Sequence, residues 1–137
     1  MEKRTDKDNY YLNIARAVAA RSTCLHHKYG AVIVNNDEIV STGYNGAPRS
    51  ELNCCDSGIC YRDNNKVPVD SSAAQHGNKY GTCVAVHAEQ NAVISASRKE
   101  MLGGILYLAC IDFENEPAPC NVCNRLIKNA GIERVVV

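Results

Sequence analysis

Two short motifs limit the possible folds of this chain more than any other feature: His87-Ala88-Glu89 and, much farther along, Pro119-Cys120-Asn121-Val122-Cys123. One imidazole and two thiolates can hold a single zinc ion and leave a fourth position open, which is typical of catalytic zinc sites. A carboxylate two residues after the histidine can then move protons on and off an activated water. Any fold for this chain must therefore bring two distant segments into one site.

Both motifs have the features of helix starts. Cys120 and Cys123 are three residues apart, which places both sulfurs on one side of a first helical turn. The partial positive charge at a helix N-terminus favours the thiolate form that zinc requires, and Pro119 is well tolerated at such a start. Alone, the cysteine pair also fits a redox or structural zinc motif, and the His87 motif fits an ordinary helix start. Their order and placement together favour a catalytic zinc.

Hydrophobic periodicity predicts alternating helices and strands. The expected elements, in chain order, are a helix capped by Asp8 over residues 8–22, a hairpin of strands 31–34 and 39–42 around a polar turn, a helix from His87 to about Lys99, a strand over 105–111, a helix over 120–130 stopped by Gly131, and a strand over 132–137. This order predicts an α/β fold, a three-layer α/β/α sandwich with a mixed central sheet.

The bulk properties predict a single domain over residues 1–137, in which residues 47–82 form a polar, cysteine-bearing insert. Basic and acidic residues both total 15, and no basic stripe stands out, so a polymeric nucleic acid is not an expected partner. The charged N-terminus lacks the apolar stretch of a secretory signal, and no segment is apolar enough for a membrane span. A cytoplasmic protein is expected.

Eight cysteines in a chain without an export signal indicate reduced thiols and metal ligation, not a disulfide framework. Cys110 lies in an apolar run and is predicted to be a small buried hydrophobe. Asn45 can be read as a turn residue that tolerates a left-handed backbone. His26 and His27 can be read as ordinary surface residues.

Several segments extend the pattern beyond the zinc motifs. The chain resembles the cytidine and deoxycytidylate deaminase superfamily, for which a His-x-Glu with a later Pro-Cys-x-x-Cys is a general signature. Gln90-Asn91 and the Gly43-Tyr44-Asn45-Gly46 turn are more specific to its deoxycytidylate (dCMP) branch. The segments that carry the resemblance are Arg21–Cys24, Gly30–Val34, Thr42–Pro48, Val86–Ala92, Pro119–Cys123 and Ala130–Ile132.

The resemblance implies hydrolytic deamination of dCMP to dUMP with release of ammonia. It assigns the zinc to His87, Cys120 and Cys123, and it makes Glu89 the group that carries protons from water to ring N3 and to the departing amine. It further implies that the Ala88 N–H binds the base carbonyl and that Asn45 binds the sugar hydroxyl. Arg21 and Ser22 would lie near the phosphate.

The resemblance also bears on the other cysteines and on the partners. Some relatives bind a second, structural zinc, for which the candidates here are Cys24, Cys54, Cys60 and Cys83, with Cys55 as an alternative; the competing interpretation is scattered reduced thiols. Homo-oligomers, with a hexamer favoured, and the effectors dCTP and dTTP are expected from the family.

Three departures from the family stand out. Leu25 and His26 occupy positions where many relatives carry arginine, so phosphate recognition is left to Arg21, Lys28 and a charged His26. The link over residues 110–118 is longer and more acidic than usual, and the chain stops at Val137, where a shortened sheet edge is expected. Two alternatives stay open: a deaminase acting on another cytosine nucleoside, nucleotide or aminated heterocycle, and a non-enzymatic zinc module, which would not need Glu89.

Overall fold

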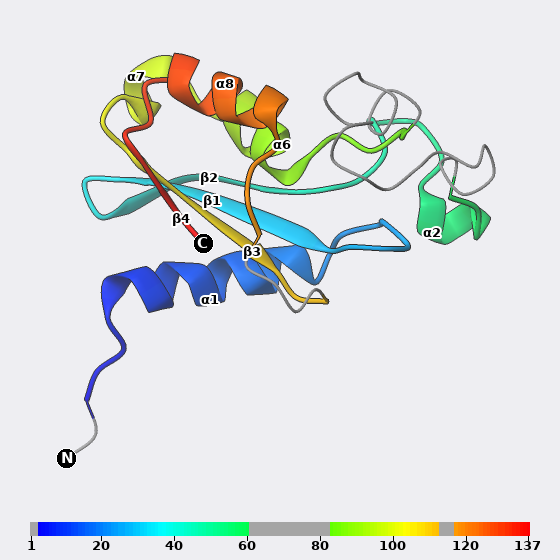
Figure 1. Cartoon of the computed structure of the whole chain (residues 1–137), viewed down its shortest axis with the longest axis horizontal. Helices are drawn as coiled ribbons and strands as arrows, with labels where there is room; N and C mark the ends of the chain where they lie inside the picture. The colour runs from blue at the N-terminus through cyan, green and yellow to red at the C-terminus, as the bar shows by residue number, and fades with distance from the viewer. Residues whose placement is uncertain (1–2, 61–82, 113–116) are drawn as a thin grey trace.

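The structure is a computed structural model that describes residues 3–60, 83–112 and 117–137 (Figure 1). Its elements, in chain order, are α1 (Lys7–Ala19), β1 (Tyr29–Asn35), β2 (Glu38–Tyr44), α2 (Cys54–Ser57), α6 (Ala88–Ile94), α7 (Arg98–Met101), β3 (Ile105–Cys110), α8 (Asn121–Asn129) and β4 (Arg134–Val136).

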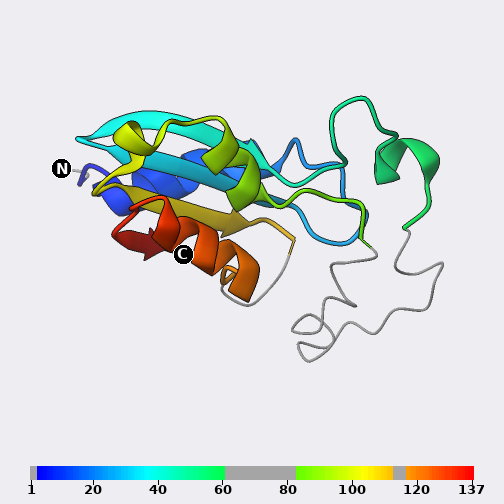
Figure 2. The same ribbon diagram turned by 90° about the horizontal axis from the view of Figure 1, so that it is seen from above.

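The four strands form one mixed sheet in the order β2-β1-β3-β4. β1 is antiparallel to both β2 and β3, whereas β4 runs parallel to β3. Helix α1 covers one face of this sheet, and α6, α7 and α8 cover the other (Figures 1 and 2). The expected three-layer sandwich with a mixed sheet is confirmed.

Alternation along the strands divides the core into two clusters, because successive side chains in a strand point to opposite faces. Ala31 and Ile33 of β1 face α6 and α8, together with Leu106 and Leu108 of β3. The residues between them, Val32 and Val34 of β1 and Tyr107 and Ala109 of β3, face α1. Helices are therefore held against both faces, and the starts of α6 and α8 lie over the same face.

The first helix begins and ends earlier than predicted. Its N-cap is Asp6, whose carboxylate accepts a hydrogen bond from the Asn9 backbone N–H at 2.8 Å, and Asp8 lies inside the helix. Asp8 has other partners: the Tyr107 hydroxyl donates to it at 2.8 Å and the Arg134 guanidinium at 2.6 Å. The expected cap was wrong because Asp8 ties α1 to β3 and β4.

The hairpin has longer strands and a tighter turn than expected. Asn36 and Asp37 both adopt positive φ, at 50° and 61°. Two consecutive left-handed residues are the requirement of a two-residue turn whose twist matches that of the flanking strands. The ladder therefore extends to Asn35 and Glu38, which pair directly.

The helix expected from His87 to about Lys99 is interrupted. α6 ends at Ile94, and a separate short helix, α7, begins after Ser97. The Ser97 side chain accepts from the Glu100 N–H at 3.2 Å, while the Glu100 carboxylate accepts from the Ser97 N–H at 3.0 Å. This reciprocal capping box provides a new helix start within the apolar pattern.

The C-terminal half agrees with the sequence pattern more closely. β3 is an interior strand whose four central residues are buried, and α8 lies where the third helix, over residues 120–130, was expected. Gly131 has a φ of 87° and ends that helix in the left-handed conformation. Cys110, by contrast, is only half-buried and donates a hydrogen bond to Asp112, so the prediction of a small buried hydrophobe was wrong.

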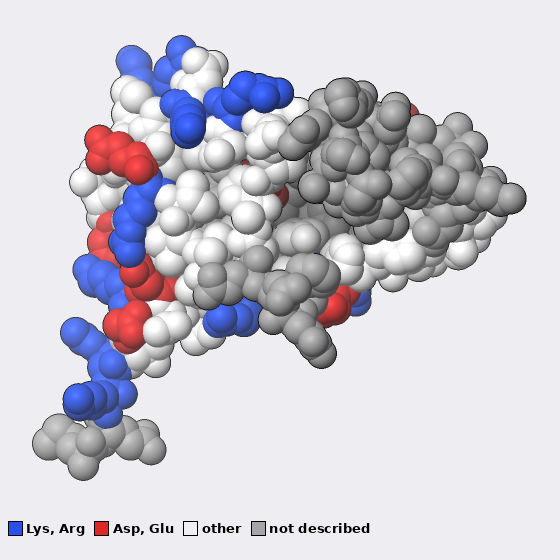
Figure 3. All heavy atoms as spheres, viewed as in Figure 1, with Lys and Arg blue, Asp and Glu red and all other residues white. Residues whose placement is uncertain are grey.

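Part of the cysteine-bearing insert forms a local structure, the one-turn helix α2, which lies to one side of the sandwich (Figure 2). Residues 61–82 of the insert and residues 113–116 of the acidic link lie outside the described residues. On the face seen in Figure 3, acidic and basic side chains lie beside one another along the edge near the N-terminus. No helix within the described ranges has both the length and the apolar character needed to cross a membrane.

Candidate metal centre

The two sequence motifs meet at the starts of α6 and α8. His87 is the N-cap of α6 and Cys120 is the N-cap of α8. The Nδ1 atom of His87 lies 3.7 Å from the Cys120 sulfur and 3.3 Å from the Cys123 sulfur. We refer to His87, Cys120 and Cys123 as the donor cluster; their donor atoms all lie within 4.8 Å of one another.

The donor cluster fits a zinc ion. Zinc–sulfur and zinc–nitrogen bonds of about 2.3 and 2.0 Å in tetrahedral geometry place the sulfur and nitrogen ligands about 3.5 Å apart. The two observed separations, 3.7 and 3.3 Å, lie on either side of that value. One nitrogen and two sulfurs are also donors that zinc prefers, and three protein ligands leave room for a substrate or water.

Three contacts fix the backbone around His87. Its N–H donates to the Gln90 side-chain oxygen at 2.8 Å. The preceding residue, Val86, exchanges two backbone hydrogen bonds with Gly46, at 2.7 and 3.1 Å. Gly43 of β2 lies so close to the backbone of α6 that a Cβ there would collide with the Ala88 oxygen. The start of α6 is thus fixed to the sheet and to the loop after β2.

The second half of the cluster is fixed by the start of α8. The Cys120 side chain accepts a hydrogen bond from the Cys123 N–H at 3.4 Å, and the Cys123 side chain is fully buried. One turn later Ile127, only 1% exposed, anchors α8 in the core. The i, i+3 spacing therefore places both sulfurs on the side of the first turn of α8 that faces the protein interior.

Glu89 is buried beside the donor cluster, with 5% of its surface exposed. Burial raises the pKa of its carboxyl above the ordinary value, and the nearby His87 and a hydrogen bond from Cys123 only partly oppose this effect. A hydrogen bond from Cys123 lowers the pKa of Cys120 to about 4, and the same hydrogen bond together with burial raises the pKa of Cys123.

Asn45 is buried in a hydrogen-bond network. Its Oδ1 accepts from the Ser22 hydroxyl at 2.5 Å and from the Tyr29 N–H at 2.9 Å, and its Nδ2 donates to the His27 carbonyl at 2.9 Å. Asn45 is not among the described residues with positive φ, so the interpretation as a left-handed turn residue was wrong. The side chain instead fixes the segment between α1 and β1.

The other predicted substrate residues lie around this network. Ser22 is buried, Arg21 is exposed, and both line an open groove with Asn91 and Ile94 of α6. Ala88 is fully buried in the first turn of α6, next to His87. The lining of that groove does not include the donor cluster.

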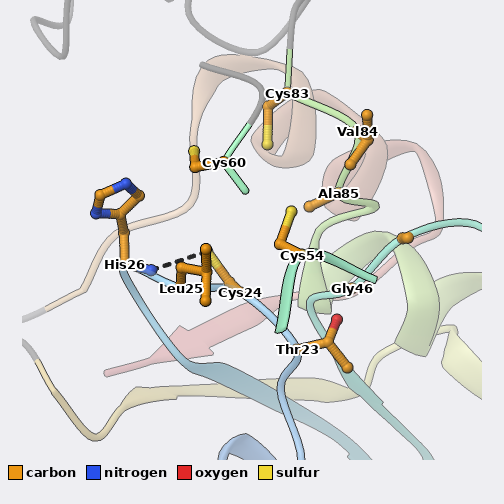
Figure 4. A pocket seen from close by; sticks show the side chains of 11 residues that line it. Thr23, Cys24, Leu25, His26, Gly46, Cys54, Cys60, Cys83, Val84 and Ala85 are labelled. Carbon is orange, nitrogen blue, oxygen red and sulfur yellow. Dashed lines mark hydrogen bonds between the residues drawn. The ribbon is translucent and has the colours of Figure 1, made fainter. Parts of the chain in front are cut away.

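The four cysteines proposed for a second metal border one pocket (Figure 4). Cys54 of α2 and Cys83 direct their sulfurs toward each other, and Cys24 and Cys60 lie beside them. Burial raises the pKa of Cys54, as do the neighbouring Cys24, Cys60 and Cys83. These four cysteines are not among the groups within the described ranges whose donor atoms all lie within 4.8 Å of one another.

Sequence reasoning missed two features. In the sequence, Gln90 was considered only as part of the family resemblance. Its position three residues after His87 is nevertheless the spacing of a capping box. His27, Cys110 and Asp112 form a second group whose donor atoms lie within 4.8 Å of one another. No sequence spacing indicated this group, because strand pairing brings its members together.

Comparison with known proteins agrees with the site. Residues 5–137 match the model of the cytidine and deoxycytidylate deaminase zinc-binding region, and the chain belongs to this family. The deoxycytidylate deaminase of Mycobacterium phage D29 is 41% identical over 133 residues, covering 97% of this chain and 94% of the phage protein. The deoxycytidylate deaminase of Schizosaccharomyces pombe is 36% identical over 94% of this chain but only 36% of the yeast protein.

A solved structure has the same fold. The crystal structure of dCMP deaminase from cyanophage S-TIM5, in complex with dCMP and dUMP, superimposes with a TM-score of 0.65. It is 24% identical in sequence, and the match covers 98% of this chain and 82% of that one.

Proposed function

We propose that this chain catalyses the hydrolytic deamination of dCMP to dUMP and ammonia. The observation that carries the proposal is a buried carboxylate, Glu89, held beside one imidazole and two thiol groups. A binding module would bury that carboxyl at a cost and gain nothing from it. The substrate is supported by the phage D29 relative, named a deoxycytidylate deaminase, which matches over nearly its whole length.

His87, Cys120 and Cys123 would hold zinc, which supplies Lewis-acid activation of the attacking water. Glu89 accepts a proton from that water on its carboxylate and delivers it to ring N3. It then takes the proton of the hydroxyl newly bonded to C4 and passes it to the amine, which leaves as ammonia while the C4 carbonyl forms. Burial raises the pKa of this carboxyl toward the range in which a group can both take and give protons. The Ala88 N–H binds the base carbonyl, Asn45 the sugar hydroxyl, and Arg21 and Ser22 contribute near the phosphate.

The test is ammonia release from dCMP, deoxycytidine and dCTP by the wild type, Glu89→Gln and the exposed control Glu38→Gln. Loss of a general acid–base group lowers kcat by about 10²- to 10⁴-fold, so Glu89→Gln is expected to lose turnover and Glu38→Gln to retain it. Turnover of dCMP alone supports the assignment. Turnover of deoxycytidine without a phosphate requirement would move the activity to the alternative substrates, and unchanged turnover in Glu89→Gln would refute the mechanism.

We also propose a second, structural zinc bound by Cys24, Cys54, Cys60 and Cys83, with Cys55 as the alternative to one of them. Four thiols around one pocket support it, as does the need of a polar insert for an ordering contact. Metal analysis of purified protein is expected to give two zinc ions per chain, falling to one in Cys54→Ser. One zinc per chain in both proteins would refute it.

The remaining proposals concern assembly, regulation and location. The chain forms a homo-oligomer, with a hexamer favoured, responds to dCTP and dTTP, and works in the cytoplasm. Family membership supports them, and the exposed apolar side chains of Ile94 and Val122, at 76% and 52%, are compatible with subunit contacts. Sedimentation velocity with and without each nucleotide tests the proposals on assembly and on regulation. A monomer under all conditions would refute the proposed homo-oligomer.

A further inference from the structure

His27, Cys110 and Asp112 form a cluster at the end of the sheet where β1 begins and β3 ends, separate from both sets of cysteines above. Their donor atoms, one imidazole nitrogen, one sulfur and one carboxylate oxygen, all lie within 4.8 Å of one another. Tyr29 pairs with Cys110 where β1 begins and β3 ends, so the residues next to these strand ends are brought together.

The cluster is held by backbone contacts that do not involve a metal. The Asp112 Oδ1 accepts a hydrogen bond from the Lys28 N–H at 2.8 Å, and the Lys28 carbonyl accepts from the Ile111 N–H at 3.2 Å. On the other side, Asn45 donates to the His27 carbonyl at 2.9 Å. The chain segments that carry all three donors are therefore already fixed relative to one another, so a ligand would not have to order them.

The spacing suits a small, borderline-soft cation. The Cys110 sulfur lies 3.3 Å from the Asp112 Oδ1, and tetrahedral zinc places a thiolate and a carboxylate oxygen about 3.5 Å apart. Mixed nitrogen, sulfur and oxygen donors favour zinc over magnesium or calcium, which prefer oxygen alone. We propose that His27, Cys110 and Asp112 form an additional binding site for a divalent transition metal, with zinc as the expected ion.

A cation bound at this site would displace a proton from the Cys110 thiol. Burial raises the pKa of the Cys110 thiol, and its hydrogen bond to the Asp112 carboxylate acts in the same direction. The metal-free thiol therefore keeps its proton, and one proton is released when the cation binds. Asp112 is also exposed, so the site exchanges metal with the solvent.

The test uses protein that retains its tightly bound zinc and measures alkylation of Cys110 by iodoacetamide, followed by peptide mass spectrometry, at increasing zinc concentration. Occupancy slows alkylation by the factor 1 + [Zn²⁺]/Kd, which is about tenfold when zinc exceeds Kd ten times. The wild type is expected to show this saturable protection.

Two variants and one matched control decide the outcome. His27→Gln and Asp112→Asn each remove one donor, and Asp112→Asn retains an oxygen that can accept from Lys28; both should shift the protection to at least about tenfold higher zinc. His26→Gln removes the adjacent imidazole, which is not part of the cluster, and should leave the protection unchanged. Circular dichroism and retained tight zinc verify folding. Absence of protection in the wild type, or equal protection in all four proteins, would overturn the proposal.

Discussion

Gly43 offers a sharp test of how the sheet positions the candidate metal centre. An added Cβ at this position would collide with backbone atoms of α6, including the Ala88 oxygen and the Ala92 nitrogen, and would lie 2.9 Å from the Asn91 carbonyl carbon. Ordinary contacts of this kind begin at 3.4 Å, and backbone cannot rotate away as a flexible side chain can. Gly43→Ala must therefore push α6 away from β2.

The displacement is about 1 Å, and misplacing catalytic groups by that distance costs about 100-fold in rate. Because His87 and Glu89 lie at the start of α6, we expect kcat/KM for dCMP to fall by about that factor and zinc retention against a chelator to weaken. Overpacking should also cost about 1–3 kcal/mol in the free energy of unfolding.

Gly30→Ala is the matched control. Its Cβ would collide with the Ala15 oxygen and come within 2.5 Å of the Ala19 nitrogen, both in α1 on the opposite face of the sheet. We expect a similar loss of stability but nearly unchanged zinc retention. The two variants are compared by denaturant unfolding, chelator competition and steady-state kinetics below their unfolding midpoints. If Gly43→Ala retained wild-type zinc affinity and turnover, or if both variants lost zinc equally, the contact between β2 and α6 would not position the site.

Gln90→Ala removes the acceptor of the His87 N–H and should weaken zinc retention, whereas Gln90→Glu should preserve it; chelator competition separates the two. Asp8→Asn should lower the free energy of unfolding by about 1 kcal/mol at pH 7. The expected loss is this small because solvent screens the exposed ion pair. The hydrogen bonds from Arg134 and Tyr107 lower the pKa of Asp8, so this contribution is fully present above the ordinary pKa of the carboxyl and is lost as the pH falls through the lowered one. Denaturant titrations at pH 7 and at pH 3 should therefore show a smaller difference at the lower pH. Removing metal with a chelator should abolish deamination, and added zinc should restore it in the wild type but not in Cys123→Ser.

The sequence predicts the layers and the donor cluster well, because both depend on strong local patterns. His87, Cys120 and Cys123 converge as expected since each motif lies at a helix start and both helices pack on one face. Element boundaries were harder to predict, since they depend on which competing partner a polar side chain takes. Asp8 bonds to Tyr107 and Arg134 from distant strands, which a local capping pattern cannot reveal.

Tertiary contacts also explain what the sequence left out. The group of His27, Cys110 and Asp112 depends on the register of β1 against β3, and a shift by one residue would turn Cys110 to the other face. The role of Asn45 was likewise not visible in the sequence, because its hydrogen-bond partners are three separate residues that lie 16 to 23 positions earlier in the chain. Such networks become visible only once the strands are paired.

The two hydrogen bonds between Gly46 and Val86 have a consequence for the tolerance of this chain to insertions. They join the two ends of a long excursion directly before His87, so the position of that histidine is set by the junction and not by the number of residues between its ends. Doubling the length of a flexible loop with fixed ends costs only about 0.6 kcal/mol. Residues can therefore be added within the excursion at little cost while the start of α6 stays in place, which makes it a suitable location for inserting a sensor domain.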